Sequence, residues 1–414
     1  MEEWKDVKVS ELLQEISMGP FGSNIKVDNF IDSGVPVLNG SNLQGYKLNE
    51  DSFNYVSEEK ADSLGKANAH RGDIVITHRG TLGQIIYIPQ DSKFNRYVIS
   101  QSQFRLKLKS EIVRPDYFVY FFHTRIGQHK ILMNASQVGV PALARPTTTF
   151  KEVSIPIPPL SVQDRIMAIL LCIDDKIELD RKINSNLEEQ AKALFKSWFI
   201  NFEPFKDGKF VDSELGKIPE GWNVKSASDI FNITIGKTPP RKESKWFTKG
   251  IGNVWVSISD MKLNGAFIGH SSEKLSDDAI AKFNIVMVPK DTILLSFKLT
   301  IGRVAISSCD LTTNEAIARF SIDNPRLREF TYLYLKNYNF QSLGSTSSIA
   351  TAVNSKIIKS MPFLLPDADT MESFHKLSKP LFDQIEVTQK QTDCLASIRD
   401  VLLPKLMSGE IEVK

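Results

Sequence analysis

The sequence predicts an α+β protein in which two α/β domains of the same kind alternate with two long helices. Three observations predict this fold class. The stretch from Leu160 to Asn201 contains neither Gly nor Pro, and its apolar residues recur at steps of three and four. A second stretch with the same pattern closes the chain. Each stretch follows a run of short β-branched segments, and both runs carry related motifs in the same order.

The first predicted helix occupies residues 158–201. At a rise of 1.5 Å per residue, a helix of this length extends for roughly 60 Å, which is more than the width of a small domain. We therefore expect a strut between domains rather than a core helix. Its apolar face consists of Ile166, Leu170, Ile173, Ile177, Leu187, Ala191, Leu194 and Trp198.

The C-terminal helix repeats the first one. When Ile385 is placed on Ile177, the apolar positions of the two helices coincide. A polar layer inside a coiled coil lowers stability but fixes register and partner choice. Two unrelated amphipathic helices would not be expected to share such a layer. The polar residues that interrupt both faces coincide as the pairs Asp180 with Thr388 and Asn184 with Thr392.

The composition is that of an ordinary globular protein, with 42% hydrophobic and 24% charged residues in 414. No apolar run approaches the roughly 18 residues that cross a bilayer, and the acidic N-terminus is unlike a secretion signal. Cys172, Cys309 and Cys394 are widely separated, so we expect neither a disulfide framework nor a thiolate metal site. These features predict a cytoplasmic protein with no membrane partner.

Positive charge is concentrated in one part of the first domain. The net charge is only +2, but residues 66–145 hold twelve Lys or Arg against four Asp or Glu, whereas residues 1–65 hold five against twelve. A basic sector of this kind is typical of a surface that faces phosphates. Folding could equally bring the two sectors together and neutralise them, so both interpretations stay open.

The pattern divides the chain into four parts. Within the first domain we expect a short helix up to Ile16, a Gly-rich turn, a helix that starts at Pro115 and a polar loop over residues 134–149. Strands are expected at residues 35–38, 73–77, 84–88 and 103–108. The four parts are the first domain (1–157), the first helix (158–204), the second domain (205–365, with a linker at 205–221) and the second helix (366–414).

The second domain repeats this skeleton with different loops. Residues 290–296 echo residues 72–77, and Thr300-Ile301-Gly302 echoes Thr81-Leu82-Gly83. A helix rich in aromatic residues follows again, and then a Ser/Thr-rich loop at residues 342–348. Matching frameworks with divergent loops indicate one scaffold that presents two different surfaces.

The sequence gives little sign of catalysis. Gly236-Lys237-Thr238 resembles the end of a phosphate-binding loop, but the Gly required five residues earlier is Phe231. The six His are scattered and no His-Glu-x-x-His motif is present, so no metal site is expected. Asp116 is not followed by a nuclease-like Glu-x-Lys, and no Asn-Pro-Pro-Tyr element of a base methyltransferase occurs. We therefore predict no catalytic residues.

Polar loops that could contact nucleic acid remain. The sharpest candidate is Thr77-His78-Arg79-Gly80-Thr81, because Arg can hold guanine O6 and N7 bidentately and His and Thr can contact bases or phosphates. The alternative is a surface hairpin whose Arg pairs with a carboxylate. The counterpart loop in the second domain offers Lys298 and Thr300. Weaker candidates, of types that also fill ordinary turns or contact phosphates, are Asn39, Ser41, Asn42, Gln101, Gln103, Lys107, Lys237, Thr238, Ser257 and Ser259.

Several stretches of the chain resemble one family. The most specific stretches are residues 160–208, 212–222 and 402–411. The turn Gly19-Pro20-Phe21-Gly22-Ser23 and the step Thr81-Leu82-Gly83 belong to the same pattern. On these stretches, the chain resembles the specificity subunit of Type I restriction–modification systems over essentially its full length.

The resemblance implies two target-recognition domains, each reading one half of a bipartite, asymmetric DNA target. Two helices packed as an antiparallel coiled coil would hold the domains apart about an approximate two-fold axis, and their length would set the half-site spacing. The subunit would be non-catalytic and would bind double-stranded DNA, two modification subunits and, in some complexes, restriction subunits. S-adenosylmethionine, ATP and Mg²⁺ would belong to those partners, with no cofactor in this chain.

The first helix carries extra apolar bulk at Phe195, Phe199 and Phe202, which we expect to bind the modification subunits. Two other functions stay open at this stage. A self-contained DNA methyltransferase or nuclease would need a cofactor motif, and none is evident. A coiled-coil scaffold with two protein-binding domains would bind no DNA at any salt concentration.

Overall fold

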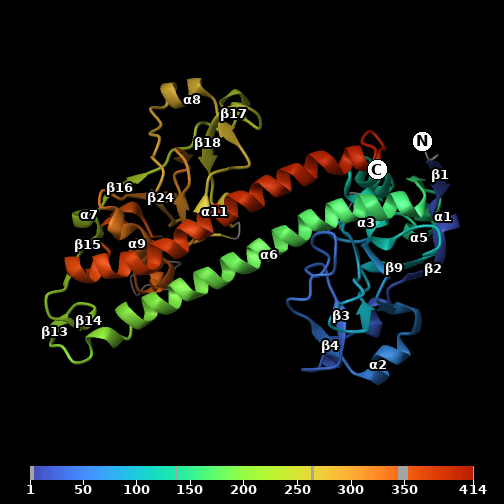
Figure 1. Cartoon of the computed structure of the whole chain (residues 1–414), viewed down its shortest axis with the longest axis horizontal. Helices are drawn as coiled ribbons and strands as arrows, with labels where there is room; N and C mark the ends of the chain where they lie inside the picture. Colours follow the sequence, from blue (N-terminus) through green and yellow to red (C-terminus); the bar gives the residue numbers. More distant parts are fainter. Residues whose placement is uncertain (1–3, 137–138, 263–264, 344–352, 414) are drawn as a thin grey trace. The chain divides into compact units, whose positions relative to one another are not determined.

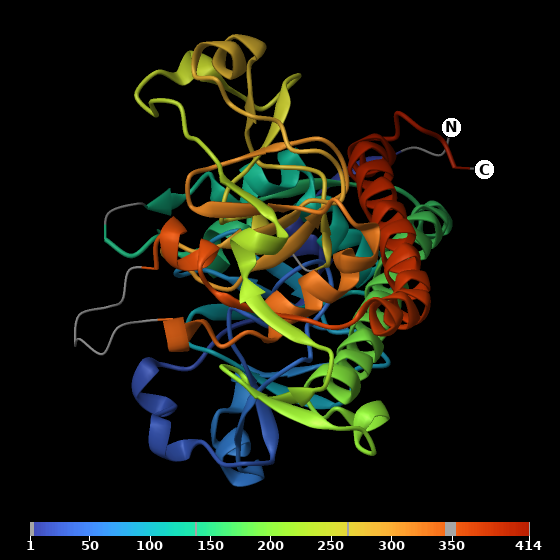
Figure 2. The same ribbon diagram turned by 90° about the vertical axis from the view of Figure 1, so that its left-hand side faces the viewer.

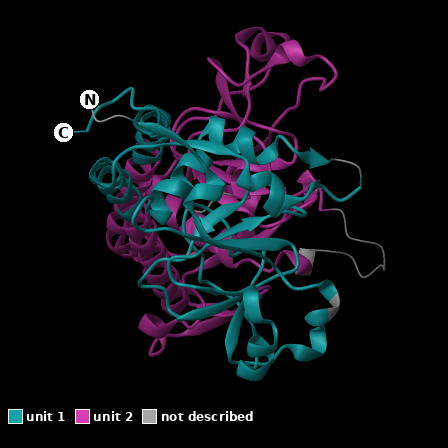
Figure 3. Cartoon of the chain, turned by 90° about the vertical axis from the view of Figure 1, so that its right-hand side faces the viewer, with its two compact units in different colours: residues 1–175, 395–414 teal, residues 176–394 magenta. Residues whose placement is uncertain are grey.

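The computed structural model of the chain describes residues 4–136, 139–262, 265–343 and 353–413 (Figure 1). It divides into two compact units, which Figure 3 distinguishes by colour. Unit 1 comprises residues 1–175 and 395–414, and unit 2 comprises residues 176–394. The division falls inside both long helices, so each unit consists of one domain together with part of each helix. Among the described residues, no helix is long and apolar enough to cross a membrane.

Unit 1 contains two four-stranded sheets, with the strand orders β2-β9-β6-β7 and β4-β3-β8-β5. A two-stranded ribbon of β1 (Lys5–Lys8) and β12 (Ser154–Ile157) brings the start of the chain beside the segment that leads into the first long helix. The strands of the two sheets are β2 (Leu13–Met18), β3 (Val35–Leu38), β4 (Asn54–Val56), β5 (Asn68–His70), β6 (Ile74–Thr77), β7 (Ile85–Tyr87), β8 (Arg96–Ile99) and β9 (Gln103–Leu108).

The main core of unit 1 lies between its first sheet and α3 (Pro115–His123). Pro115 starts α3 because its fixed φ suits the first helical position and it has no N–H to leave unpaired. Phe118 and Phe122 of α3 share the core with Phe104 of β9. The remaining elements of the domain are α1 (Val9–Leu12), α2 (Glu58–Ser63), α4 (Arg125–Leu132), β10 (Ala135–Ser136), β11 (Ala142–Leu143) and α5 (Pro146–Lys151).

Unit 2 repeats this arrangement. Its sheet β16-β24-β21-β22, extended by β19, corresponds to the first sheet of unit 1, and β17-β20-β18-β23 corresponds to the second. The ribbon β15–β25 takes the place of β1–β12, and α9 takes the place of α3. The bounds are β13 (Phe210–Ser213), β14 (Gly216–Pro219), β15 (Asn223–Ser226), α7 (Ala227–Ile230), β16 (Asn232–Ile235), β17 (Phe247–Thr248), β18 (Asn253–Val256), β19 (Phe267–Ile268), β20 (Lys274–Leu275), α8 (Asp277–Lys282), β21 (Ile293–Ser296), β22 (Val304–Ser307), β23 (Thr312–Thr313), β24 (Ile317–Ser321), α9 (Arg328–Asn337), α10 (Ser355–Lys359) and β25 (Pro362–Leu365).

The two long helices pack antiparallel within each unit, as Figures 1 and 2 both show. In unit 1, Arg399 near the end of the second helix donates to Asp174 of the first over 2.8 Å. In unit 2, the ring centroids of Phe199 and Phe374 lie 4.8 Å apart, at the end of the first helix and the start of the second. The helices are α6 (Leu160–Phe199) and α11 (Ala368–Met407), with 40 residues each.

The predicted polar layer is buried in unit 2. Asp180, Asn184, Thr388 and Thr392 are all buried. Asp180 pairs with Lys176 one turn earlier. The Thr388 hydroxyl donates to a main-chain carbonyl of its own helix. The layer is therefore buried with hydrogen bonds within each helix, and its role in fixing register stays a prediction.

The predicted fold class is confirmed, and so are both long helices and the four strands expected in the first domain. The helix expected up to Ile16 is wrong, because the chain leaves α1 at Leu12 and pairs with β9 as strand β2. The linker at 205–221 is wrong as well, since β13 and β14 form a hairpin whose Ile218 joins the core of unit 2.

Several short elements of unit 1 had no prediction, namely strands β4, β5 and β8. The polar loop at 134–149 contains β10, β11 and the start of α5. Most of the Ser/Thr-rich loop predicted at 342–348 lies outside the described residues.

Candidate nucleic-acid interface

Four polar loops of unit 1 meet at one edge of its domain, which we call loop edge 1. His78 N–H donates to Ser102 O over 2.9 Å, and Gly19 N–H donates to Gln103 O over 2.8 Å. The Gln84 side-chain amide donates to Gly40 O over 2.9 Å. Loops from four separate connections are thus held against one another. They comprise residues 19–22, 39–42, 78–83 and 100–103.

Unit 2 has the same arrangement, which we call loop edge 2. Phe297 N–H donates to Ala316 O over 3.0 Å, and Gly236 N–H donates to Ile317 O over 3.3 Å. Arg303 takes the place of Gln84, because its guanidinium donates to Ile258 O over 2.6 Å. One hydrogen-bonded frame therefore recurs in both units. The loops of this edge comprise residues 236–240, 257–260, 297–302 and 313–316.

The predicted Gly-rich turns are fixed by close backbone approach. A Cβ atom at Gly19 would lie 2.0 Å from Ser100 O, and a Cβ atom at Gly236 would lie 2.2 Å from Asn314 O. Since real Cβ atoms do not approach oxygen so closely, only Gly fits at either position. The glycine therefore holds the residues that follow it beside the neighbouring turn of each loop edge.

In each loop edge a second turn, at residues 39–42 or 257–260, is closed by a hydrogen bond to one of its own side chains. Asn42 Oδ1 accepts from Asn39 N over 3.0 Å, and Asp260 Oδ2 accepts from Ser257 N over 2.8 Å. Burial alone would raise the pKa of Asp260, but hydrogen bonds from Ser257 and Ser272 hold that pKa below its usual range. Asn42 is buried and donates to two main-chain carbonyls. Its amide is thus used inside the fold. Ser41 and Ser259 are exposed, but their hydroxyls are hydrogen-bonded to Asn39 and Ser257 of the same turns.

The loop at residues 77–81, which contains the strongest predicted base contact, has both exposed and buried side chains. Arg79 and Thr81 are exposed. Thr77 is buried, with its hydroxyl donating to Gln84 Oε1 over 3.0 Å. His78 is half-buried, its Nε2 lies 3.1 Å from Gln101 O, and burial lowers its pKa. No carboxylate of the described chain lies within ion-pair distance of Arg79, so the alternative of a paired surface Arg is not seen.

The counterpart loop of unit 2 presents different side chains. Lys298 and Thr300 are exposed, and Leu299 between them is 100% exposed. Leu299 has φ +60°, whereas Gly80 at the same place in unit 1 has φ +93°. A left-handed conformation is unfavourable for Leu, so the exposed tip of this loop carries backbone strain that Gly80 avoids in unit 1.

The remaining predicted residues fall into two groups. Gln101 and Lys107 are exposed. Gln103 is buried, and its Oε1 accepts from Ser100 N over 2.9 Å, so this side chain shapes its own turn. Asn42, Thr77 and Gln103 therefore serve the frame of loop edge 1, and the exposed residues are left to contact a ligand.

The stretch that resembled a phosphate-binding loop is an ordinary turn. Lys237 Nζ donates to Phe283 O over 3.3 Å and to Asn284 O over 3.2 Å. The Thr238 hydroxyl donates to the Glu315 carboxylate. Across the described ranges, no cluster of three or more His, Cys, Asp or Glu side chains could hold a metal ion.

Unit 2 also contains a basic segment that was not predicted from the sequence. Residues 237–249 contain five Lys or Arg and one Glu. The Arg241 guanidinium lies 4.4 Å from the ring centroid of Phe247 and 4.6 Å from that of Trp255. Such cation–π contacts hold a charged group in place at the surface. The concentration of Lys and Arg in this part of the sequence is the signal from which the segment could have been predicted.

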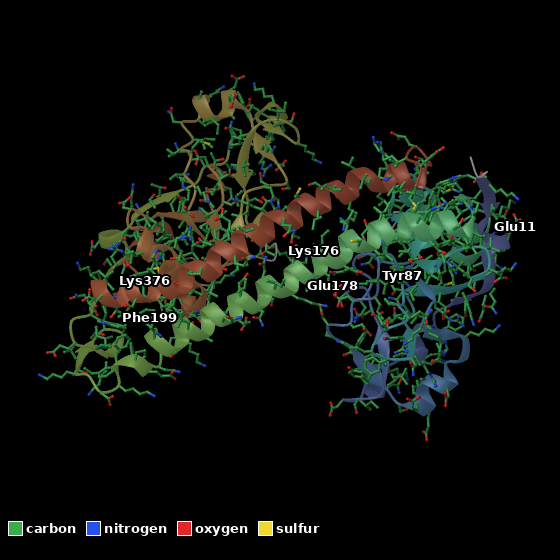
Figure 4. The ribbon with its side chains drawn as sticks, viewed as in Figure 1. Glu11, Tyr87, Lys176, Glu178, Phe199 and Lys376 are labelled. Carbon is green, nitrogen blue, oxygen red and sulfur yellow. The ribbon has the colours of Figure 1, made fainter. Side chains whose placement is uncertain are left out.

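The expectation that Phe195 and Phe199 bind a partner is wrong. The two side chains are only 2% and 5% exposed and lie in the core of unit 2. Figure 4 labels Phe199 at the end of α6. Phe202 is half-buried, with its ring centroid 5.7 Å from that of Trp222. The extra bulk on α6 packs against its own domain, which a view of the helix alone could not reveal.

Other apolar side chains of the long helices are exposed instead. Ile169 and Leu179 on α6 are 40% and 52% exposed, and Leu377 and Val387 on α11 are 51% and 61% exposed. When Ile385 is placed on Ile177, these positions coincide as Ile169 with Leu377 and Leu179 with Val387. Exposed apolar side chains therefore recur at two pairs of equivalent positions on the long helices.

Comparison with known proteins identifies the family. Residues 1–189 and 219–394 match the Type I restriction modification DNA specificity domain. The MjaIX specificity subunit of Methanocaldococcus jannaschii is 29% identical over 99% of this chain and 94% of its own length. The HindI specificity subunit of Haemophilus influenzae is 24% identical over 99% and 100%. The crystal structure of the Type I S subunit from M. genitalium matches 98% of this chain and 96% of its own, with 16% identity and a TM-score of 0.56, and so shares its fold. The chain belongs to the Type I restriction–modification DNA specificity family.

Proposed function

We propose that the chain is the DNA specificity subunit of a Type I restriction–modification complex. In this proposal, loop edge 1 and loop edge 2 each read one half of a bipartite DNA target. The chain recognises the target, and methyl transfer and cleavage belong to its partner subunits. S-adenosylmethionine, ATP and Mg²⁺ would be bound by those partners.

One observation carries the proposal. The two loop edges share a hydrogen-bonded frame but differ at several of its exposed positions. Arg79 stands where unit 2 has Lys298, and Gln101 stands where unit 2 has Glu315. A frame that is kept while its exposed side chains change is what reading two different base sequences requires. The target should therefore be asymmetric.

The exposed side chains suit different contacts. Arg79 can bind guanine O6 and N7 with two hydrogen bonds, and Gln101 can bind adenine N6 and N7. Thr81 and Thr300 can donate to or accept from bases. Lys107 and the basic segment 237–249 would contact phosphates, which position the duplex without reading it.

The long helices would set the distance between half-sites and bind the modification subunits. The repeated exposed positions Ile169 and Leu377, and Leu179 and Val387, support this docking role. Because each position occurs once per repeat, we propose two modification subunits, one for each half of the repeat. Restriction subunits would join through those partners.

The proposal is tested by purifying the chain with its modification subunit and measuring methyl transfer to a library of duplexes. We expect methylation of one bipartite sequence, and a steep loss of DNA affinity with added salt because phosphate contacts release counterions. Methylation without sequence preference would contradict the proposal. A chain that binds no DNA at any salt concentration would point to a protein scaffold.

A further inference from the structure

A cavity of about 170 Å³ opens within loop edge 1. Its apolar wall comes from Ile25, Phe30 and Leu38, and Asn39 and Gln101 stand beside this wall with their polar side chains. The cavity is bordered by three of the four loops that form the edge. It therefore belongs to the surface that we propose reads DNA.

Phe21 lines the same cavity and is 85% exposed. The exposed Phe21 ring continues the apolar wall of the cavity, and a ligand that covered both would remove their apolar area from water. Phe21 lies in the Gly-rich turn, whose Gly19 N–H donates to Gln103 O. The Gln101 side chain reaches this turn, because a Cβ atom at Gly22 would lie 2.0 Å from Gln101 Oε1.

The corresponding turn of unit 2 is built differently. After Gly236 it continues with Lys237, Thr238 and Pro239, and no aromatic residue stands in this turn. Thr238 is bonded to Glu315, the counterpart of Gln101. The combination of an apolar cavity, an exposed Phe and neighbouring amides is thus a feature of loop edge 1.

We propose that Phe21 and this cavity bind the methyl-bearing edge of a thymine in the half-site read by unit 1. Among the four base pairs, the thymine 5-methyl is the apolar group offered in the major groove, and Phe is one of the side chains that contact it. The Gln101 amide matches the adenine of the same pair, and the Asn39 amide nitrogen can donate to the thymine O4, since Asn39 Oδ1 already accepts from Ser41. The cavity has room for one methyl group, since a volume of about 150 Å³ already admits a whole benzene-sized ring.

Phosphate is a poorer occupant, since the residues that line the cavity carry no charge. This inference rests on the proposed function, because it assigns one base contact within the proposed reading surface.

The test uses the complex of the full chain with its modification subunit and duplexes that contain the methylated target. Each thymine of both half-sites is replaced in turn by deoxyuridine, which removes only the methyl group. At one position, in one half-site, we expect kcat/KM for methyl transfer to fall roughly four-fold, the factor that corresponds to one buried methyl group.

The variant Phe21→Ala should lower kcat/KM on the thymine duplex by at least as much, and deoxyuridine at that position should then have little further effect. Val27→Ala is the matched control, because Val27 is 80% exposed in the same segment and does not line the cavity. It should behave as the native chain does. Since Phe21 is exposed, its replacement should leave the melting temperature unchanged.

Three results would overturn the inference while leaving the proposed function intact. They are a specific target without thymine in either half-site, independent and multiplicative effects of Phe21→Ala and deoxyuridine, or loss of the modification subunit from the Phe21→Ala complex with DNA reading unchanged. The last result would make Phe21 a protein contact. Methylation without any sequence preference would instead contradict the proposed function itself.

Discussion

Unit 1 and unit 2 share one framework but carry different side chains on it. In each unit a buried Arg stands at the same place in the first sheet, Arg105 in β9 and Arg319 in β24. Each ties the sheet to a main-chain carbonyl of the preceding connection, Arg105 to Lys66 O over 2.8 Å and Arg319 to Val286 O over 2.9 Å. This Arg therefore links the sheet to a neighbouring connection in both units.

The partners of this Arg have changed. Arg105 forms ion pairs with Asp73 over 3.3 Å and with Glu15 over 2.8 Å. Arg319 donates to Thr234 Oγ1 and Ile235 O, and burial lowers its pKa. The geometry of the framework is therefore more constant than its chemistry. The side chains of the two units differ more at the loop edges than in the sheets, because exposed side chains such as Arg79 and Lys298 do not hold the framework together.

The largest effect is expected from lengthening both helices. Four residues, about one helical turn, would be inserted between Lys182 and Ile183 and at the repeat-equivalent place between Lys390 and Gln391. We expect the native target to be lost and replaced by one with the same half-sites and a spacer longer by about two base pairs, since four residues add roughly 6 Å. Sequencing of methylated bases in a host that expresses the variant would show this. An unchanged spacer would mean that the helices do not set the distance.

Next in size is the loss of core packing in unit 2. Phe199→Ala should lower the free energy of unfolding of unit 2 by about 3–5 kcal/mol, because it removes a buried aromatic ring. Phe202→Ala is the control and should cost less, since that ring is half-buried. Chemical denaturation followed by fluorescence would measure both. Weaker binding of the modification subunit at unchanged stability would restore the docking role that burial argues against.

A matched pair of substitutions compares the two loop edges directly. Arg79→Ala should weaken discrimination at one base pair of one half-site by about 1–3 kcal/mol, and Lys298→Ala should act on the other half-site only. Methylation rates on duplexes with single base changes would separate the two. If either variant weakened methylation of all duplexes by the same factor, that side chain would be a phosphate contact.

The smallest effect concerns the tips of the two edges. Leu299→Gly should stabilise unit 2 by up to about 1 kcal/mol, because Gly adopts a left-handed conformation without strain. Gly80→Leu should destabilise unit 1 by about 1–2 kcal/mol for the same reason. Thermal unfolding would measure both. If Leu299 contacts DNA, its replacement by Gly should also reduce methylation, so that stability and activity change in opposite directions.

The sequence predicted what periodicity and repetition determine. The long helices were evident because their apolar face recurs over forty positions, and the strands with continuous apolar residues were found for a similar reason. Strands β4, β5 and β8 were missed because each begins with a polar residue, Asn54, Asn68 or Arg96, whereas equally short strands with an apolar start were found. Tertiary pairing rather than propensity makes them strands.

The sequence predicted which loops form the candidate interface, but not which of their side chains are exposed to a ligand. Asn and Gln are equally suited to read adenine and to close a turn, and the sequence does not show which they do. In the structure Asn42 and Gln103 close turns, whereas Gln101 is exposed. Phe195 and Phe199 illustrate the same limit, since an apolar residue on a helix can face its own domain or a partner.

The central claim is that two different loop edges on one repeated framework read two different half-sites. It is tested most directly by sequencing the methylated bases in a host that expresses the native chain with its modification subunit. We expect one motif that consists of two unlike half-sites separated by a spacer of constant length and no fixed sequence. A continuous motif, two identical half-sites or methylation at many unrelated sequences would contradict the account.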